Sequence, residues 1–344
     1  MRSSPPFLGA VLAACLLGSP SALTAQEERG EPLLGQLRES LKSPAFSVGA
    51  LFQFAADFQN DRTVVGENGF AVANARVRLT GELDGGVGYL FQSNFGSLLD
   101  LRLTWNPRRA FAVDGGLYKT PFSGEFLTPA GETDFVTRSR TVNALRPGRQ
   151  VGVQVRGRVA SGRLEYRIGA FNGGGGPGGN DDEHFTYGAR LAYDRVLDGP
   201  SGGRLTVAVN GFTSDEPARY RGSAPEDVRF TGTDMLLGAD LRATRGRWLG
   251  AAEWIRAEPD DDDPTGPEPM GWHLTVGFQV VPDGRILARW DAFRPEVEGI
   301  PDSDLVVLGY NHAPTGVTRL QTNVEIPTED GFEPRLRLNA QLHF

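Results

Sequence analysis

Cysteine, lysine and long apolar runs are scarce in this chain of 344 residues. The single cysteine, Cys15, lies in an N-terminal apolar segment, so we expect no disulfide in the mature protein. Beyond that segment no stretch holds about 18–20 consecutive apolar residues, which excludes a bundle of transmembrane helices. The only lysines are Lys42 and Lys119, so arginine carries nearly all positive charge. The formal net charge of -8 gives a nucleic-acid partner no electrostatic support.

The N-terminus has the pattern of a secretory signal peptide. Arg2 precedes an apolar run over Phe7–Leu17, and small residues follow as far as Ala25, after which we expect cleavage. Export also fits the absence of any other cysteine. An alternative is that Cys15, which ends a Leu-Ala-Ala-Cys sequence, is lipidated, with residues 16–44 as a tether.

Residues 26–44 are predicted to form a periplasmic leader. Within it Leu34, Leu37 and Leu41 share one face of a predicted helix over residues 31–43. One heptad is too short to indicate a coiled coil. The leader is therefore either a short helix or an irregular segment, and the alternative is a helix that trimerises or plugs the protein.

The last ten residues alternate strictly between apolar and polar side chains. A period of two indicates a β-strand. The apolar face holds Leu336, Leu338, Ala340, Leu342 and Phe344. The polar face holds Arg335, Arg337, Asn339, Gln341 and His343. Strands of outer-membrane barrels alternate in this way, apolar toward lipid and polar toward a wet lumen, and the aromatic end resembles an assembly signal.

Similar segments recur about every 20 residues over residues 45–344. The expected strands are 46–58, 70–82, 87–95, 98–105, 110–119, 149–160, 163–172, 184–196, 204–213, 230–244, 247–257, 271–281, 285–294, 303–311, 317–326 and 333–344. Every second connection is a tight Gly/Pro/Asp turn, whereas the alternate connections include the long ones. This sorting predicts an all-β, transmembrane, antiparallel barrel of about sixteen strands with periplasmic turns and external loops. No strict internal repeat appears, which argues against a propeller.

The polar strand faces are rich in arginine. The residues expected to face the lumen are Arg76, Arg78, Arg102, Arg156, Arg167, Arg335 and Arg337. Unpaired arginines would not point into a dry core, but they can stand in a water-filled lumen. They favour anions in the pore, and the alternative is that they pair with carboxylates across the wall as scaffolding.

The longest connection, residues 120–148, is the third external loop, and a long loop in an economical barrel is usually functional. Around it the chain reads GLYKTPFSGEFL at 116–127, DFVTRS at 134–139 and NALRPGRQVGVQ at 143–154. These runs resemble the phosphate-selective porins O and P, and the similarity extends over residues 110–175. The resemblance implies a sixteen-stranded outer-membrane porin, typically trimeric, whose third loop folds into the channel.

The selective members of that family line the constriction with basic side chains, and Lys119 keeps the motif position. Candidate constriction and selectivity residues near the loop are Lys119, Arg138, Arg140, Arg146 and Arg149, together with Glu125 and Asp134. Arginine can bind phosphate through two donors at once. The alternative is that Lys119–Glu125 and Arg138–Asp134 are ion pairs that hold the loop to the wall.

Other chemistry has weak support. The acidic run at 260–263 lacks the spacing of a calcium loop and favours a solvated external loop, where divalent ions could bridge it to lipopolysaccharide. The histidines show no metal-ligand spacing. His273 near Thr275 is the nearest approach to a hydrolase site, without a recognisable motif. We therefore expect no enzyme, no metal and no cofactor.

The sequence predicts a passive diffusion channel in the bacterial outer membrane for small hydrophilic solutes, with an anion preference in which phosphate is one candidate. Its expected partners are those solutes, outer-membrane lipid and lipopolysaccharide, and, from the resemblance, two further copies of the chain. The competing hypothesis is a structural or adhesive barrel whose lumen is occluded by its loop.

Overall fold

A computed structural model describes residues 42–43, 46–59, 69–173, 176–180, 184–199, 201–214, 233–259, 268–296, 302–328 and 333–344. The strands of this part are β1 (Lys42–Ser43), β2 (Phe46–Gln59), β3 (Gly69–Leu83), β4 (Val87–Asn94), β5 (Ser97–Arg108), β6 (Phe111–Lys119), β7 (Arg149–Val159), β8 (Leu164–Phe171), β9 (Thr186–Val196), β10 (Gly203–Ser214), β11 (Thr233–Arg245), β12 (Trp248–Pro259), β13 (Met270–Val281), β14 (Gly284–Arg294), β15 (Ser303–His312), β16 (Thr318–Pro327) and β17 (Arg335–His343). Its helices are α3 (Gly124–Leu127), α4 (Arg140–Leu145) and the 3₁₀ turns η2 (Ala130–Glu132) and η3 (Ala160–Gly162).

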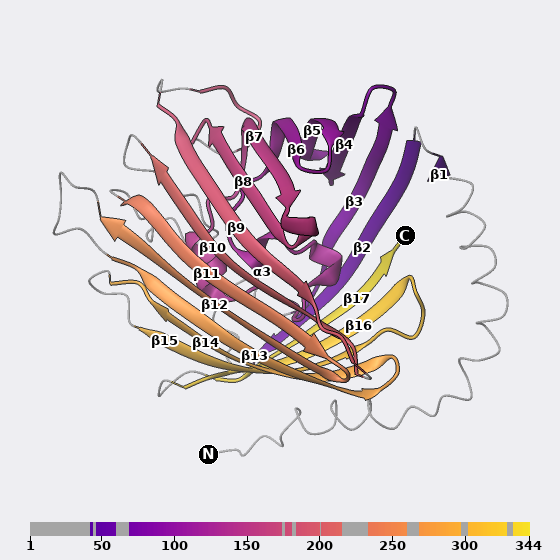
Figure 1. Cartoon of the computed structure of the whole chain (residues 1–344). Helices are drawn as coiled ribbons and strands as arrows, with labels where there is room; N and C mark the ends of the chain where they lie inside the picture. The colour runs from indigo at the N-terminus through magenta and orange to yellow at the C-terminus, as the bar shows by residue number, and fades with distance from the viewer. Residues whose placement is uncertain are drawn as a thin grey trace, which may run out of the picture.

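Strands β2 to β17 form one closed antiparallel barrel (Figure 1). Each strand pairs with its neighbours in the chain, and the last strand returns to the first through pairs such as Arg337 with Asp57. The short β1 adds one further pairing, to the start of β2. The predicted fold class, a transmembrane barrel of about sixteen strands, is confirmed. Among the described residues, no helix is long and apolar enough to cross a membrane.

The two faces of each strand differ as the alternation predicts. In β13, Trp272, Leu274 and Val276 are exposed on the outer face, while His273 and Thr275 are buried on the inner face. Aromatic residues on the outer face of other strands are likewise exposed, among them Trp105, Trp248, Trp254 and Tyr193. A full apolar band faces outward because lipid, rather than a core, covers it.

The turns at one end of the barrel are tight. In the β3–β4 turn Gly85 and Gly86 have φ angles of 81° and 75°, a backbone conformation that residues with a Cβ rarely adopt. A Cβ on Gly86 would also lie 2.9 Å from the carbonyl oxygen of Asn106 near the end of β5. At the opposite end the third loop, residues 120–148, is the longest connection that is described throughout.

Several sequence predictions fall outside the described residues: the signal peptide over residues 1–25 with Cys15, most of the leader at 26–44, and the acidic run at 260–263. Only the end of the predicted helix over 31–43 can be examined. There Lys42 and Ser43 form strand β1, because they extend the sheet by pairing with Ser47 and Phe46. The prediction that the helix reaches Ser43 is therefore wrong.

Candidate functional site

The third loop is an ordered segment with two short helices. Helix α3 begins after Ser123, whose Oγ accepts a hydrogen bond from the N–H of Phe126 at 3.0 Å. Helix α4 begins after Ser139, whose Oγ accepts from the N–H of Val142 at 3.2 Å. Serine caps satisfy N–H groups that the first helical turn leaves without a partner. The loop thus carries its own local structure.

The loop lies inside the barrel, and Figure 1 shows α3 within the ring of strands. Residues further along the loop reach the opposite wall. The Asn323 side chain of β16 accepts from the N–H of Val136 at 2.7 Å. The Gln341 side chain of β17 donates to the carbonyl oxygen of Gly131 at 2.8 Å. Since these wall side chains are on the inner face, the loop crosses the lumen from the β6–β7 side to the β16–β17 side.

Apolar packing anchors the loop on one side of the lumen. Phe122, Phe126, Val142 and Leu145 of the loop share a buried cluster with wall residues. The wall contributes Phe171, Phe212, Leu236, Ile255, Ala257 and Phe293 from β8 to β14. A second cluster places Phe135 against Leu249, Leu287, Leu305 and Val307. This side of the lumen therefore resembles a protein core.

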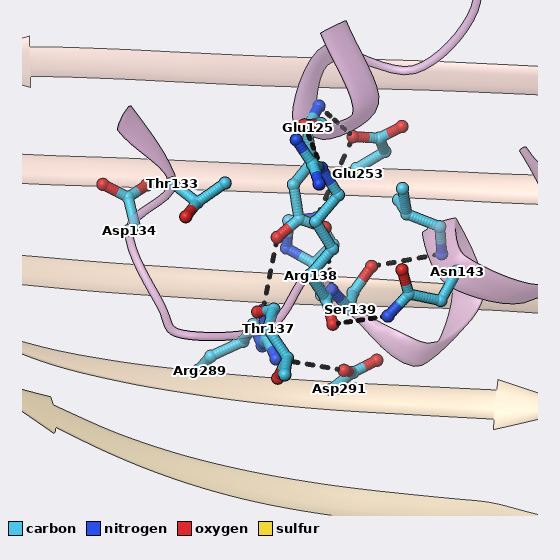
Figure 2. A network of polar contacts seen from close by, with 12 residues as sticks. Glu125, Thr133, Asp134, Thr137, Arg138, Ser139, Asn143, Glu253, Arg289 and Asp291 are labelled. Carbon is cyan, nitrogen blue, oxygen red and sulfur yellow. Dashed lines mark hydrogen bonds and ion pairs between the residues drawn. The ribbon is translucent and has the colours of Figure 1, made fainter. Parts of the chain in front are cut away.

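A polar network adds to that anchoring, and Figure 2 shows it from close by. Glu125 Oε1 accepts from Arg289 of β14 at 3.3 Å, and Glu125 Oε2 accepts from the N–H of Ser139 at 2.9 Å. Burial would raise the pKa of Glu125, but His273, Arg289 and the Ser139 N–H outweigh it and hold this pKa below its usual range. The carboxylate therefore stays ionised in its buried site.

Asp134 is held in the same manner further along the loop. Its two carboxylate oxygens accept from the guanidinium of Arg242 in β11 at 2.5 and 3.0 Å. The loop–wall pairs that the sequence suggested, Lys119–Glu125 and Arg138–Asp134, are accordingly wrong. Both carboxylates serve as anchors, but their partners are arginines on the far wall, which local spacing cannot reveal.

The cations of those suggested pairs bind backbone oxygens instead. Lys119 Nζ donates to the carbonyl oxygens of Phe126 and Thr128 at 2.5 and 3.0 Å. Arg138 donates to the carbonyl oxygens of Glu125 and Thr128 at 3.0 and 2.7 Å. These bonds bring no carboxylate to either side chain, because their acceptors are backbone carbonyl oxygens.

Two cavities lie beside the loop, and we name them the outer and the inner cavity. The outer cavity has a volume of about 560 Å³ and lies between the loop, β3, β5 and β6. Among the described residues, its charged lining is entirely basic: Arg76, Lys119, Arg138, Arg146 and Arg149. The inner cavity, of about 320 Å³, extends toward Phe344 and also meets Asp100 and Glu132. Arg76, Lys119 and Arg149 line both cavities and mark where they meet.

In the part of the chain that the structure describes, the Asp100 carboxylate pairs with this basic group. Arg149 contacts Asp100 through two hydrogen bonds, at 3.1 and 3.3 Å. Arg76 donates to the neutral Asn74 side chain at 2.7 Å and forms no ion pair within the described residues. Burial, followed by the charges of Arg138 and Arg149, lowers the pKa of Arg146 to about 10, so it remains charged at neutral pH.

Most of the other arginines expected in the lumen are paired with wall carboxylates. Arg102 and Arg156 meet Asp114, at 3.8 and 2.6 Å, and Arg167 meets Glu165 at 2.7 Å. Arg335 and Arg337 both contact Asp57, at 2.5 and 3.2 Å. Arg78 lines the inner cavity and has no ion pair within the described residues. The scaffolding alternative thus fits five of these arginines. Arg76 and Arg78 do not fit it, because no carboxylate pairs with them among the described residues.

Arg140, also a candidate from the sequence, is placed differently. Its backbone N–H donates to Asp291 Oδ2 of β14 at 2.9 Å, within the anchoring network. Its side chain lines neither the outer nor the inner cavity. The residue therefore helps to begin helix α4 and does not face the passage.

Sequence reasoning missed a buried polar band beneath the loop. Arg190 of β9 binds Asp240 of β11 at 2.5 and 2.8 Å, and Glu253 of β12 accepts from the N–H of Glu125 at 3.0 Å. His273 lies 3.7 Å from Glu125, and Thr275 is buried beside it. Alternation placed these side chains inward, but nothing in the sequence indicated that the loop covers them. Within the described residues, no cluster of histidine, cysteine or acidic residues could hold a metal ion.

Comparison with known proteins bears on the family. Residues 46–209 match the family model of the phosphate-selective porins O and P. Over these residues the chain is similar to that family. The resemblance that the sequence indicated is thereby confirmed, and the protein is an outer-membrane porin. Family and fold point to a channel rather than an enzyme. No curated protein matches the chain in sequence.

Solved porins share the fold. OmpT, an outer-membrane protein of Vibrio cholerae, is 13% identical with a TM-score of 0.61, over 88% of this chain and 99% of its own. An anion-selective porin from Comamonas acidovorans is also 13% identical, with a TM-score of 0.59 over 87% and 99%. A mutant of Rh. blastica porin is 12% identical, with a TM-score of 0.54 over 87% and 100%. At this identity the likeness concerns the fold of the porin.

Proposed function

We propose that this porin is a passive channel that prefers small anions. The observation that carries the proposal is the charge of the outer cavity, where, among the residues that the structure describes, five basic side chains and no acidic side chain line the wall. Lys119, Arg138, Arg146 and Arg149 are the selectivity residues, and Arg76 joins them from β3. A ring of one sign lowers the free energy of the opposite ion in a narrow passage.

The basic side chains of the outer cavity lie close enough to affect one another's charge. The pKa of Arg146 is lowered by burial and by its cationic neighbours, which means that these positive charges repel one another. An anion that enters the cavity reduces this repulsion, whereas a cation increases it. Salt screens the interaction over about 8–10 Å, so the preference should weaken as ionic strength rises.

Phosphate is a narrower proposal within anion preference. The description of the matched family and that of the porin from Comamonas acidovorans name phosphate and anion selectivity for those proteins. In this chain Lys119 and Arg138 are the candidate phosphate donors. A phosphate block of chloride current that is lost in Arg138→Ala or Lys119→Ala would support that assignment.

The sign of selectivity can be measured directly. In a planar bilayer with a KCl gradient, we expect stable conductance steps and a reversal potential on the anion-selective side. A cation-selective reversal potential would overturn the proposal. The variant Arg156→Gln is a suitable control, because Arg156 is paired with Asp114 and lines neither the outer nor the inner cavity.

A second candidate function has one observation in its favour. The apolar clusters around Phe122 and Phe135 fill much of the lumen beside β8 to β15, as would be needed in an occluded structural or adhesive barrel. The same bilayer measurement separates the two candidates, since an occluded barrel gives no conductance steps although it is folded.

Assembly and export complete the proposal. We propose a homotrimer, because the family resemblance implies it and because one solved form of OmpT is described as a trimer. Light scattering of the detergent-purified protein measures the oligomeric state. Cleavage after Ala25 removes the predicted signal peptide, and intact-mass measurement of the exported protein distinguishes it from lipidation at Cys15.

A further inference from the structure

The outer cavity has an apolar surface as well as a basic one. Leu98 and Leu99 of β5, Leu117 of β6 and Pro147 of the loop line it, together with Pro177. These side chains lie in the same cavity as Arg76, Lys119 and Arg149. A channel that handled only hydrated inorganic ions would gain nothing from an apolar wall at this point, because such ions keep their affinity for water.

A β-bulge creates part of that apolar surface. The pairing of β4 with β5 jumps from Gln92–Asp100 to Ser93–Leu98, so Leu99 has no partner on β4. In a regular strand Leu99 would point to the face opposite that of Asp100. A β-bulge changes the direction of the extra residue's side chain. Leu98 and Leu99 consequently both reach the cavity.

The donors of the basic group are largely occupied. Lys119 and Arg138 each bind two backbone carbonyl oxygens, and Arg149 binds Asp100 through two nitrogens. Their charges still attract an anion at a distance. A dehydrated phosphate, however, needs several donors that converge on its oxygens. This cavity therefore has a positive potential that attracts anions, but few of its hydrogen-bond donors remain available to a ligand.

Phe126 forms the back of the cavity between two cations. Lys119 Nζ lies 5.1 Å from the centre of its ring, and the Arg146 guanidinium carbon lies 5.5 Å from it. These cation–π contacts hold both charges beside an apolar ring. A ligand seated there meets positive charge and apolar surface at the same time.

We propose that the outer cavity takes organic monoanions with an apolar body, such as ring-bearing carboxylates, in preference to inorganic phosphate. The carboxylate is drawn by the basic group, and the apolar body covers Leu98, Leu99 and Pro147. A volume of about 560 Å³ is sufficient for such a solute. This inference rests on the proposed anion preference and names the solute class of that same site.

The test uses the purified full-length porin in a planar bilayer. Its anion selectivity is first established from the reversal potential in a KCl gradient. Chloride conductance is then titrated with two matched pairs of blockers: acetate against benzoate, and inorganic phosphate against phenyl phosphate. We expect benzoate to reach half-block at a concentration roughly fivefold below that of acetate, from partial burial of one ring face. We expect phenyl phosphate to block more strongly than phosphate.

Two variants test the role of the apolar wall. In Leu99→Asn, and independently in Leu98→Asn, the advantage of benzoate should fall below about twofold while the reversal potential is unchanged. The second variant covers the case in which a change at the bulge prevents folding. Leu90→Asn is the matched control, because Leu90 lines only the inner cavity of the two, and it should retain the full advantage.

The outcomes separate this inference from the proposed function. Equal block by benzoate and acetate in an anion-selective channel overturns the solute class alone. An advantage that survives both leucine substitutions overturns the assignment to this cavity. A channel without anion selectivity overturns the proposed function and the inference with it.

Discussion

Arg149 donates two hydrogen bonds to the Asp100 carboxylate, at 3.1 and 3.3 Å, where the outer and inner cavities meet. Within the described residues, Asp100 of this pair bonds directly to the basic group of the passage. It therefore limits the positive potential that a permeating ion experiences, and the two partners should affect selectivity in opposite directions.

Removing the acid of this pair should strengthen anion preference. In Asp100→Asn the charge of Arg149 is no longer balanced, and we expect the anion-to-cation permeability ratio to rise by up to about fivefold, the effect of one unit charge at about 4 Å in water. Arg76→Gln should lower the ratio by a similar factor. Reversal potentials at low and high salt provide the measurement, and two shifts of the same sign would contradict the electrostatic argument.

The anchoring pair of Glu125 with Arg289 should contribute to stability. Glu125→Gln leaves the Arg289 guanidinium, only 1% exposed, with Asp291 as its remaining carboxylate at 3.5 Å. We expect a loss on the order of 3 kcal/mol in the free energy of unfolding, because a buried charge loses a partner.

Urea unfolding in lipid vesicles measures this loss. Arg204→Gln serves as the control, since its pair with Asp194 is largely exposed on the arginine side and should contribute no more than about 1 kcal/mol. Equal losses in the two variants would show that Glu125 does not anchor the loop.

The loop should also loosen in acid. Because the pKa of Glu125 lies below its unfolded value, its contribution to stability is present at pH values above the ordinary glutamate pKa. That contribution is lost as pH falls through the lowered pKa of the folded state. We expect open-channel current noise to increase over this acidic range in the native protein. Glu125→Gln should be noisy at neutral pH and change little on acidification.

Apolar contacts should hold the loop more firmly than any single ion pair. Phe122 is fully buried between the loop and the wall, and Phe122→Ala should lower the free energy of unfolding by about 3–5 kcal/mol. Phe46→Ala, at an exposed position where β2 begins, should cost much less. We also expect larger and less uniform conductance steps in Phe122→Ala, and unchanged steps would mean that the loop keeps its place without this ring.

The barrel itself was predictable because its signals are local. Alternation in β6 and β7 located those strands to within one residue at each end. The capping serines at 123 and 139 likewise act locally, because each accepts a hydrogen bond from an N–H group three residues along the chain. Such features depend on a few neighbouring residues and on water or lipid at each face. The tight Gly/Pro/Asp turns predict, in the same local manner, which end of the barrel faces the periplasm.

The partners across the lumen were not predictable from spacing. Glu125 and Arg289 lie 164 positions apart and meet only because the sheet closes and the loop turns inward. The suggested partners Lys119 and Arg138 are near in sequence, yet both bind carbonyl oxygens of the same loop. The bulge at Leu99 was equally hidden, since the residues around it read as a regular alternating strand.

The loop is anchored on the β8–β17 side, while the passage runs beside β3, β5 and β6. Apart from Phe126, which belongs to the buried cluster and also lines the outer cavity, stability and solute choice are therefore carried largely by different residues. Substitutions at positions such as Leu98 or Arg76 can accumulate without disturbing the buried clusters that hold the loop. A lineage can thus acquire a new solute preference in small steps, each of which leaves the barrel folded, and this chain is a natural scaffold for engineering such changes.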